Sequence, residues 1–500
     1  MSYSSYEPGE EAPLVVPTHD RPFDHDARLA TQDDFRPIKF INSPASALPI
    51  ALLSALAVAA TAATQIYTYA NLLCKDAQHC NDSESRKFAA SVAVATAVAN
   101  VCALFSIRGF EALCKRYTRV GLAIWLLVRS FSVIALALGV FVGNIGIAMS
   151  SQVFEGLASD NILHFSLNSL YVRAKTVNGT SKLIGSSLAL YMIGISLSPS
   201  IASLLGNFRY SFVMAYGLFL IAFLYLVVCV RVSQTDASAG SNDTRPDNID
   251  TEAEALTPTL FSRISDFMAF PVLFVTEDYW RALPGLAILF YNSAQSYIFS
   301  ALMVHTSVHF GFSSRENGHL LTIIHAVASG YLFMVLFLTP KVSAIIEQRK
   351  PKTYDVITPT SQRGKRNDKS RFTDASLALV SFLIQATALI LVAIARELWQ
   401  IYPISALLAL GLACPGFVKS YFAASFESTS KPRALAYLAI MESCGSLIGP
   451  IVVGGLQAVW SDGNTFIVAA CCVCFASILF LRGVIIDRRR VSHSEGQSSL

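Results

Sequence analysis

The chain has 500 residues, of which 53% are hydrophobic and only 14% are charged, and its formal net charge is +4. Soluble domains carry about 25% charged residues, so the composition excludes an ordinary soluble globular protein. It indicates that lipid covers much of the surface, and we expect a lipid bilayer as the main partner and no nucleic acid.

Long apolar stretches recur along the whole chain. A helix needs about 20 predominantly apolar residues to cross a bilayer. On that criterion we predict an all-α membrane protein with twelve transmembrane helices, at about 48–70, 88–107, 120–141, 145–170, 181–204, 212–232, 283–306, 317–340, 374–395, 401–424, 434–458 and 465–486.

The basic residues of the loops predict the orientation of these helices. Lys and Arg are enriched on the cytoplasmic side of membrane proteins. With a cytoplasmic N-terminus, the dense basic group between Lys341 and Arg371 and the run Arg488–Arg490 lie inside, whereas the outer loops hold few basic residues. We therefore expect both termini in the cytoplasm.

A polar, acid-containing run at 233–258 divides the predicted helices into two sets of six. It has few apolar side chains to bury, which is typical of a disordered segment. Residues 259–281 alternate apolar and polar groups, as an interfacial segment does. The predicted parts are a disordered cytoplasmic tail, an N-terminal six-helix bundle, a cytoplasmic linker, a C-terminal six-helix bundle and a cytoplasmic tail, at 1–47, 48–232, 233–282, 283–486 and 487–500.

A short motif occurs once in each half. The fifth predicted span contains Gly194, three residues, then Ser198-Pro199, and the eleventh contains Gly445, three residues, then Gly449-Pro450, 251 residues later. Small residues four apart let helices approach closely, and Pro within a span bends the helix. The pattern, the half-chain offset and the shared position predict two six-helix pseudo-repeats.

The first copy of this motif also carries a family resemblance. Gly185, Gly194, Ser198 and Pro199 resemble the antiporter signature in the fifth helix of the major facilitator superfamily. Residues 108–119 occupy the position of the superfamily's basic gating loop and keep Gly109, without its Asp and second Gly. The resemblance implies the major facilitator fold and a transport function.

Three further segments resemble the fungal tetracycline-resistance-like and proton-coupled-folate-transporter-like branch of the superfamily. They are the first outer loop from Cys74 to Asn81, the stretch 310–318 before the eighth span, and Glu442-Ser-Cys-Gly445 in the eleventh. None of these motifs identifies the substrate.

Ionisable residues lie deep in two neighbouring spans. Arg129 is near the middle of span three, and Glu155 and Asp160 lie in span four. Charged groups at membrane depth are costly and face partners or water. We expect Arg129 to pair with Glu155 or Asp160, and one of these carboxylates to exchange a proton during transport. A static ion pair that fixes helix packing is the equal alternative.

Uncharged polar residues define a second candidate site. By the resemblance, the first and seventh helices line the substrate cavity, where Gln65, Tyr291, Asn292 and Gln295 lie. An interfacial aromatic belt is the alternative; it explains Tyr67 and Tyr69 well, but Asn292 and Gln295 less well.

Other polar residues are expected to serve structure or sorting. Lys419 is expected to extend toward the cytoplasm, and Glu442 to pair with a basic loop or a helix end. Cys74 and Cys80 share an outer loop, where a disulfide is plausible. The sequon at Asn81 lies outside and can be glycosylated, whereas those at Asn178 and Asn242 are cytoplasmic.

The sequence thus favours a secondary transporter that exports a small organic solute in exchange for protons. Proton-coupled uptake and a transporter-like receptor or scaffold stay open, the scaffold because of the altered gating loop. We find no nucleophile, metal-ligand or phosphate-binding motif, so we expect no enzyme activity, no cofactor and no metal. A monomer in the plasma membrane is expected, with the vacuole as an alternative membrane.

Overall fold

The computed structural model describes residues 43–171, 177–230, 279–335, 359–426, 431–460 and 463–497. Within these ranges the regular secondary structure is helical throughout. Ten helices of the described residues are long and apolar enough to cross a membrane. Exposed leucine, isoleucine, valine and phenylalanine side chains cover their outer faces, as lipid contact requires. The protein is therefore a multi-pass, all-α membrane protein.

The helices form two groups that follow one another in the sequence. The first group consists of η2 (Pro44–Ala47), α2 (Leu48–Leu73), α3 (Asp82–Arg116), α4 (Thr118–Val142), α5 (Ile145–Leu157), α6 (Asp160–Tyr171), α7 (Val177–Ser203) and α8 (Arg209–Cys229). The second consists of α10 (Tyr279–Phe310), α11 (Ser314–Phe333), α13 (Pro359–Ile394), α14 (Leu398–Leu410), η4 (Gly411–Ala413), α15 (Cys414–Ala424), α16 (Lys431–Gly449), η5 (Pro450–Gly454), α17 (Gly455–Val459) and α18 (Asn464–Gln497).

The ends of several helices are set by local sequence signals. Asn81 caps α3, and its side chain and that of Glu84 form a reciprocal capping box; Ser313 and Glu316 do the same for α11. Such caps satisfy backbone N–H groups that have no partner inside the helix. Gly143, at φ 72°, ends α4, and Asn144 caps α5, which makes the tight turn expected between spans three and four.

Two of the twelve predicted spans are not among the ten long apolar helices. The fourth is broken into α5 and α6, of 13 and 12 residues, because the chain leaves the helix at Ala158 and Ser159. The eighth corresponds to α11, whose first turns carry Arg315, Glu316 and Asn317. Helices α3, α13 and α18 run well beyond the predicted boundaries, with 35, 36 and 34 residues.

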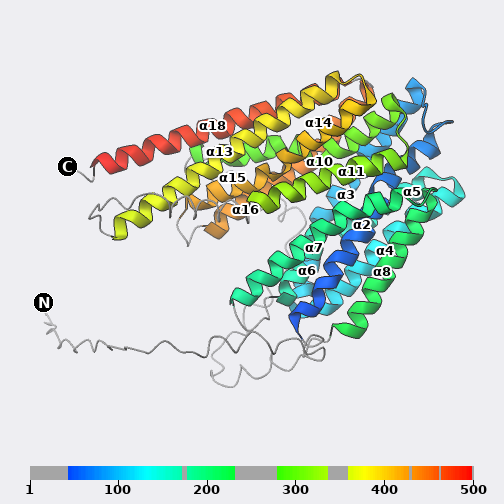
Figure 1. Cartoon of the computed structure of the whole chain (residues 1–500), viewed down its shortest axis with the longest axis horizontal. Coiled ribbons are helices and arrows are strands. Elements are labelled where there is room, and N and C mark those ends of the chain that lie inside the picture. Colours follow the sequence, from blue (N-terminus) through cyan, green and yellow to red (C-terminus); the bar gives the residue numbers. More distant parts are fainter. Residues whose placement is uncertain are drawn as a thin grey trace, which may run out of the picture.

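Figure 1 shows how the two groups are arranged. They lie side by side at one end of the molecule and diverge toward the end that carries the C-terminus of α18. Contacts between the groups run from α7 and α2 to α11, and from α3 to α10, η5 and α17. Most remaining contacts stay within a group, for example α2 with α7 and α8, and α10 with α16 and α18.

Each copy of the repeated motif makes a close helix–helix contact within its own group, and the two contacts correspond. A Cβ on Gly194 of α7 would lie 2.6 Å from the Ala55 Cβ and 3.0 Å from the Leu52 carbonyl oxygen of α2. A Cβ on Gly445 of α16 would lie 2.5 Å from the Leu289 carbonyl oxygen of α10. Leu289 follows Leu52 by 237 residues, and Ser293 follows Leu56 by the same 237 in the second contact described next, so the two helix pairs meet in the same register.

The second small residue of each copy repeats the relationship. Ser198 donates a hydrogen bond to the main-chain oxygen of Leu56, and a Cβ on Gly449 would lie 2.6 Å from the main-chain oxygen of Ser293. The prolines differ in effect, since Pro199 lies inside α7 whereas Pro450 begins the π-helical turn η5. Gly185 has nothing within 4 Å of an added Cβ and makes no such approach.

Several expectations fall outside the described residues. They are the disordered tail up to residue 42, the linker at 233–258, most of the interfacial segment and the basic group at 341–358. Of the limits proposed for the two bundles, 232 falls in a gap, whereas 48 and 283 fall in the described helices α2 and α10 and 486 falls inside α18. These limits stay predictions.

Candidate functional site

The break between α5 and α6 is supported by two side chains of α4. Interrupting a helix frees main-chain carbonyls, and in lipid these need partners. The indole Nε1 of Trp125 donates to the Ser159 carbonyl oxygen at 2.9 Å. The Arg129 Nη1 donates to the Glu155 carbonyl oxygen at 3.2 Å. Side chains of the neighbouring helix α4 therefore stabilise the break between α5 and α6.

Arg129 also forms the ion pair in this region. Its Nη2 lies 2.8 Å from Glu155 Oε1, and Glu155 Oε2 accepts from Gln152 Nε2 at 2.8 Å. Both carboxylate oxygens of Glu155 thus have partners. The side chain of Arg129 is buried, with 9% exposed, while 29% of that of Glu155 is exposed. Of the two partners proposed from the sequence, the structure pairs Arg129 with Glu155, and no direct pair with Asp160 forms.

This ion pair lies on the wall of a cavity of about 340 Å³. Ligand pockets commonly have volumes of about 300–1,000 Å³, so the cavity is large enough for a small organic molecule. Helices α2, α3, α4, α5, α6 and α10 contribute to its wall. Of the candidate site residues proposed from the sequence, Gln65, Arg129, Glu155 and Asp160 line it, as does Tyr69.

Three polar groups on the cavity wall are buried without a hydrogen-bond partner among the described residues. They are the Tyr69 hydroxyl, the Ser159 hydroxyl and Asp160 Oδ1. Tyr69 is fully buried, with Ser151, Gln65 and Gln152 as its polar neighbours. Buried polar groups normally have partners, and each exception calls for an explanation. The interfacial position considered for Tyr69 is wrong, because the residue is inside the protein.

The predicted cavity residues of the seventh span lie elsewhere. Tyr291 is buried and donates to Gln385 Oε1 at 2.7 Å and to the Gly411 carbonyl oxygen at 2.8 Å. Asn292 donates to the Glu442 carbonyl oxygen and to Ser446 Oγ, and Gln295 accepts from Gln385. These bonds link α10 to α13, η4 and α16. On the same helix, Ser300 and Met303 line the cavity instead.

Two ion pairs lie in the second group of helices. Lys419 pairs with Glu442, and both side chains are about one-third exposed, at 35% and 30%; the separate partners expected for these two residues were therefore wrong. Arg371 pairs with Asp487, which also accepts from the Tyr421 hydroxyl at 2.7 Å. This second pair is buried and joins α13 to α18.

The two groups of helices meet along α7 and α11. Ser196 and Ser329 hydroxyls lie 3.3 Å apart, and Ser200 donates to Thr322 at 2.9 Å. A Cβ on Gly318 would lie 3.0 Å from the Pro199 carbonyl oxygen. We call the contact made by these residues the α7–α11 seam.

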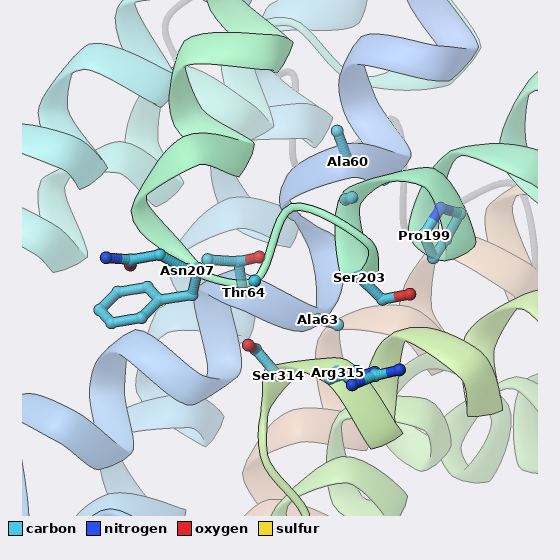
Figure 2. A pocket seen from close by; sticks show the side chains of 11 residues that line it. Ala60, Ala63, Thr64, Pro199, Ser203, Asn207, Ser314 and Arg315 are labelled. Atoms are coloured by element: carbon cyan, nitrogen blue, oxygen red, sulfur yellow. The ribbon is translucent and has the colours of Figure 1, made fainter.

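Figure 2 shows a small pocket at one end of the α7–α11 seam, with labelled side chains from α2, α7 and α11 and from Asn207 before α8. Its volume is about 30 Å³, far below the roughly 300 Å³ of ligand pockets. It marks a close contact between the helix groups, whereas the larger cavity can hold a solute.

The loop between α2 and α3 carries the remaining predicted features. A disulfide joins Cys74 to Cys80, with a Cα–Cα separation of 5.2 Å. Asn81 is exposed at the start of α3, and its Oδ1 accepts from Ser83 Oγ and from the Glu84 N–H. The sequon at Asn178 has no described side chains, and that at Asn242 lies outside the described residues. Within the described ranges, no cluster of His, Cys, Asp and Glu could hold a metal ion.

The sequence interpretation missed Ser159 and the helix break, and it assigned Tyr69 to an interfacial aromatic belt. A signal was present, since Ser159, Asp160 and Asn161 are three successive polar residues within the predicted span. Three successive residues of this kind are typical of a helix start, where Ser and Asp cap the first turn. The overall hydropathy of 145–170 masked that signal.

The chain was compared with known proteins. No family model matches it, and no curated protein matches it. Among solved structures, the human organic anion transporter MFSD10 (TETRAN) matches with a TM-score of 0.55 and 12% identity, over 89% of this chain and 100% of that chain. The nucleoside transporter NupG matches with a TM-score of 0.57 and 12% identity, over 88% of this chain and 98% of that chain. At this identity the likeness shows the fold.

Proposed function

Starting from the major facilitator fold that this chain shares with those transporters, we propose that the protein is a secondary active transporter of a small organic solute. Fold does not imply function, and the observation that carries the proposal is the cavity. It has about 340 Å³ of space and is lined by Arg129, Glu155 and Asp160. Charged groups inside a membrane protein typically mark substrate or ion pathways.

The arrangement of the two helix groups supports alternating access. In this mechanism, two bundles rock against each other around a site near the middle of the bilayer. The α7–α11 seam joins the groups at one end, and Figure 1 shows them diverging toward the end with the α18 C-terminus. With the termini in the cytoplasm, as the loop charges predict, this is an inward-facing arrangement.

Proton coupling is the second part of the proposal. The sequence left Glu155 and Asp160 as candidate proton carriers. Glu155 accepts hydrogen bonds on both oxygens, from Arg129 and from Gln152. Asp160 Oδ1 is buried and has no partner among the described residues. Glu155 is held in the ion pair with Arg129, and Asp160 makes no direct ion pair with this arginine, so we propose Asp160 as the carboxylate that exchanges the proton.

Export by proton antiport is the proposed direction, and uptake by proton symport is the alternative outcome of the test. The resemblance to the fungal tetracycline-resistance-like branch stays a prediction, because 12% identity carries the fold and not a branch. A monomeric state, glycosylation at Asn81 and residence in the plasma membrane also stay predictions.

The experiment begins with an untargeted comparison of the metabolites retained by cells with and without the protein. Compounds that differ are then tested for flux in vesicles containing the purified full chain, with and without a pH gradient. We expect flux that depends on the gradient and that Asp160→Asn uncouples. Gradient-independent flux would contradict proton coupling, and no protein-dependent flux of any differing compound would contradict the transport function.

A further inference from the structure

The charges on the cavity wall are unbalanced. Among its described lining residues, Arg129 is the only Lys or Arg, and Glu155 and Asp160 are the carboxylates. Arg129 is already engaged twice by Glu155, through the carboxylate and through the main-chain oxygen. The ion pair is therefore internally balanced, and Asp160 contributes one further negative charge when it is ionised.

The buried groups without partners lie beside this charge. Tyr69, Ser159 and Asp160 all line the same cavity, and each has an atom buried without a hydrogen bond among the described residues. A hydroxyl can donate and accept, whereas an ionised carboxylate only accepts. The complementary ligand carries a charged N–H donor for Asp160 and a polar group that can bond to a hydroxyl.

The remaining wall of the cavity is apolar. Val58 and Ile66 of α2, Val92 of α3 and Met303 of α10 line it, together with alanines. Ligand sites are mostly apolar with a few polar groups that fix orientation. The wall is thus suited to a molecule with an apolar body and one charged end.

We propose that the cavity binds an amphipathic organic cation whose protonated amine donates a hydrogen bond to Asp160. The Tyr69 and Ser159 hydroxyls hold a second polar group of the same molecule, and the apolar wall covers its hydrocarbon part. This inference rests on the transport function proposed above and names its substrate class. The amine and a proton would then occupy the same carboxylate in turn.

The geometry disfavours an organic anion at this site. To reach Arg129, an anion would have to displace Glu155 from a 2.8 Å contact. It would then leave two carboxylates facing a third negative group, and like charges at close range repel strongly where water is excluded. A cation is attracted to the Asp160 carboxylate, which has the Tyr191 hydroxyl and Arg129 as neighbours, and it leaves the ion pair of Arg129 with Glu155 intact.

A binding experiment on the purified full chain in detergent tests the proposal. The probes are arylalkyl amines, such as 2-phenylethylamine, each compared with the alcohol and the carboxylate of the same carbon skeleton. Affinity is measured by ligand-induced shift of thermal unfolding and by calorimetry. We expect the amines to bind at least about tenfold more tightly than their alcohols and carboxylates, since hydrogen bonds to charged groups contribute that much.

Substitutions test which residues cause the preference for amines. Asp160→Asn keeps the size of the side chain and removes the charge, so the preference for amines should disappear. Tyr69→Phe removes only a hydroxyl and should weaken the binding of amines that carry a second polar group by about two- to tenfold. Asp82→Asn is the matched control, because Asp82 is an exposed carboxylate at the start of α3, and it should bind amines as the native chain does.

Carboxylates that bind more tightly than amines would overturn the proposal, as would an amine preference that survives in Asp160→Asn. The absence of any stabilisation by the amine panel would overturn it too. Because binding is measured without flux, the two proposals fail separately. Amine binding without flux contradicts transport alone, whereas gradient-driven flux of a neutral or anionic compound without amine binding contradicts the substrate class alone.

Discussion

Gly194 and Gly445 occupy equivalent positions in the two halves of the protein. Gly194 lets α7 reach the Leu52 carbonyl of α2, and Gly445 lets α16 reach the Leu289 carbonyl of α10. The same register in both halves ties the sequence repeat to a repeated helix contact. These contacts hold together the helix pairs that must move as rigid bodies if the bundles rock.

Substituting either glycine should therefore destabilise the protein. A side chain at Gly194 or Gly445 would meet main-chain atoms of the facing helix within about 3 Å, and overpacking of this kind costs about 1–3 kcal/mol. We expect Gly194→Val and Gly445→Val to lower the temperature of thermal unfolding in detergent. Gly185→Val, in the same motif but with open space around its Cβ, is the control and should change little.

The ion pair of Arg129 with Glu155 should contribute more to the stability of the fold than the ion pair of Lys419 with Glu442. Removing one partner of a buried pair costs about 3–5 kcal/mol, because the other charge stays buried. Glu155→Gln leaves Arg129 without its carboxylate, whereas Glu442→Gln affects side chains that are one-third exposed. Thermal unfolding of the two variants should show a clearly larger loss for Glu155→Gln. Equal losses would contradict the assignment of Arg129 as the buried cation.

The α7–α11 seam should open during transport. Ser200 and Thr322 hydroxyls are 2.9 Å apart, so the pair Ser200→Cys and Thr322→Cys should form a disulfide under mild oxidation. We expect the crosslinked protein to lose flux and to regain it on reduction, while each single variant transports normally in both conditions. Flux that continues with the crosslink in place would show that the seam stays closed during the cycle.

The glycosylation test also checks the topology. Ser83→Ala removes the sequon at Asn81 but keeps the Asn81 and Glu84 capping box, so the start of α3 is preserved. We expect a shift in electrophoretic mobility, abolished by Ser83→Ala and by glycosidase treatment. Thr180→Ala and Thr244→Ala should have no effect, because their sequons are expected inside. A glycan on Asn178 would reverse the proposed orientation.

Most of the helices were predictable from the sequence, because length and hydropathy in lipid constrain a helix strongly. The 251-residue repeat was also predictable, since Gly194 and Gly445 stand in matching motifs. The helix break at Ser159 was not recognised, because its partners, Trp125 and Arg129, come from another helix. The interfacial position predicted for Tyr69 was wrong for a similar reason. Hydropathy indicates how deep a residue lies in the membrane but not the direction of its side chain.

The candidate site shows the same limit. Asn292 and Tyr291 were expected to face a solute, yet they bond to α16, α13 and η4. A polar side chain inside the membrane needs a partner, and the sequence does not say whether this partner is a solute or another helix. From the sequence, Glu155 and Asp160 were equal candidates for the partner of Arg129, and the structure shows that the partner is Glu155.

The central claim is that Asp160 carries the proton and the solute in turn. The most direct measurement is proton movement out of vesicles containing the full chain when a transported amine is added outside, reported by a trapped pH indicator. We predict that the amine drives proton flux through the native protein and that Asp160→Asn abolishes this coupling while Asp82→Asn preserves it. Undiminished amine-driven proton flux through Asp160→Asn would contradict the account.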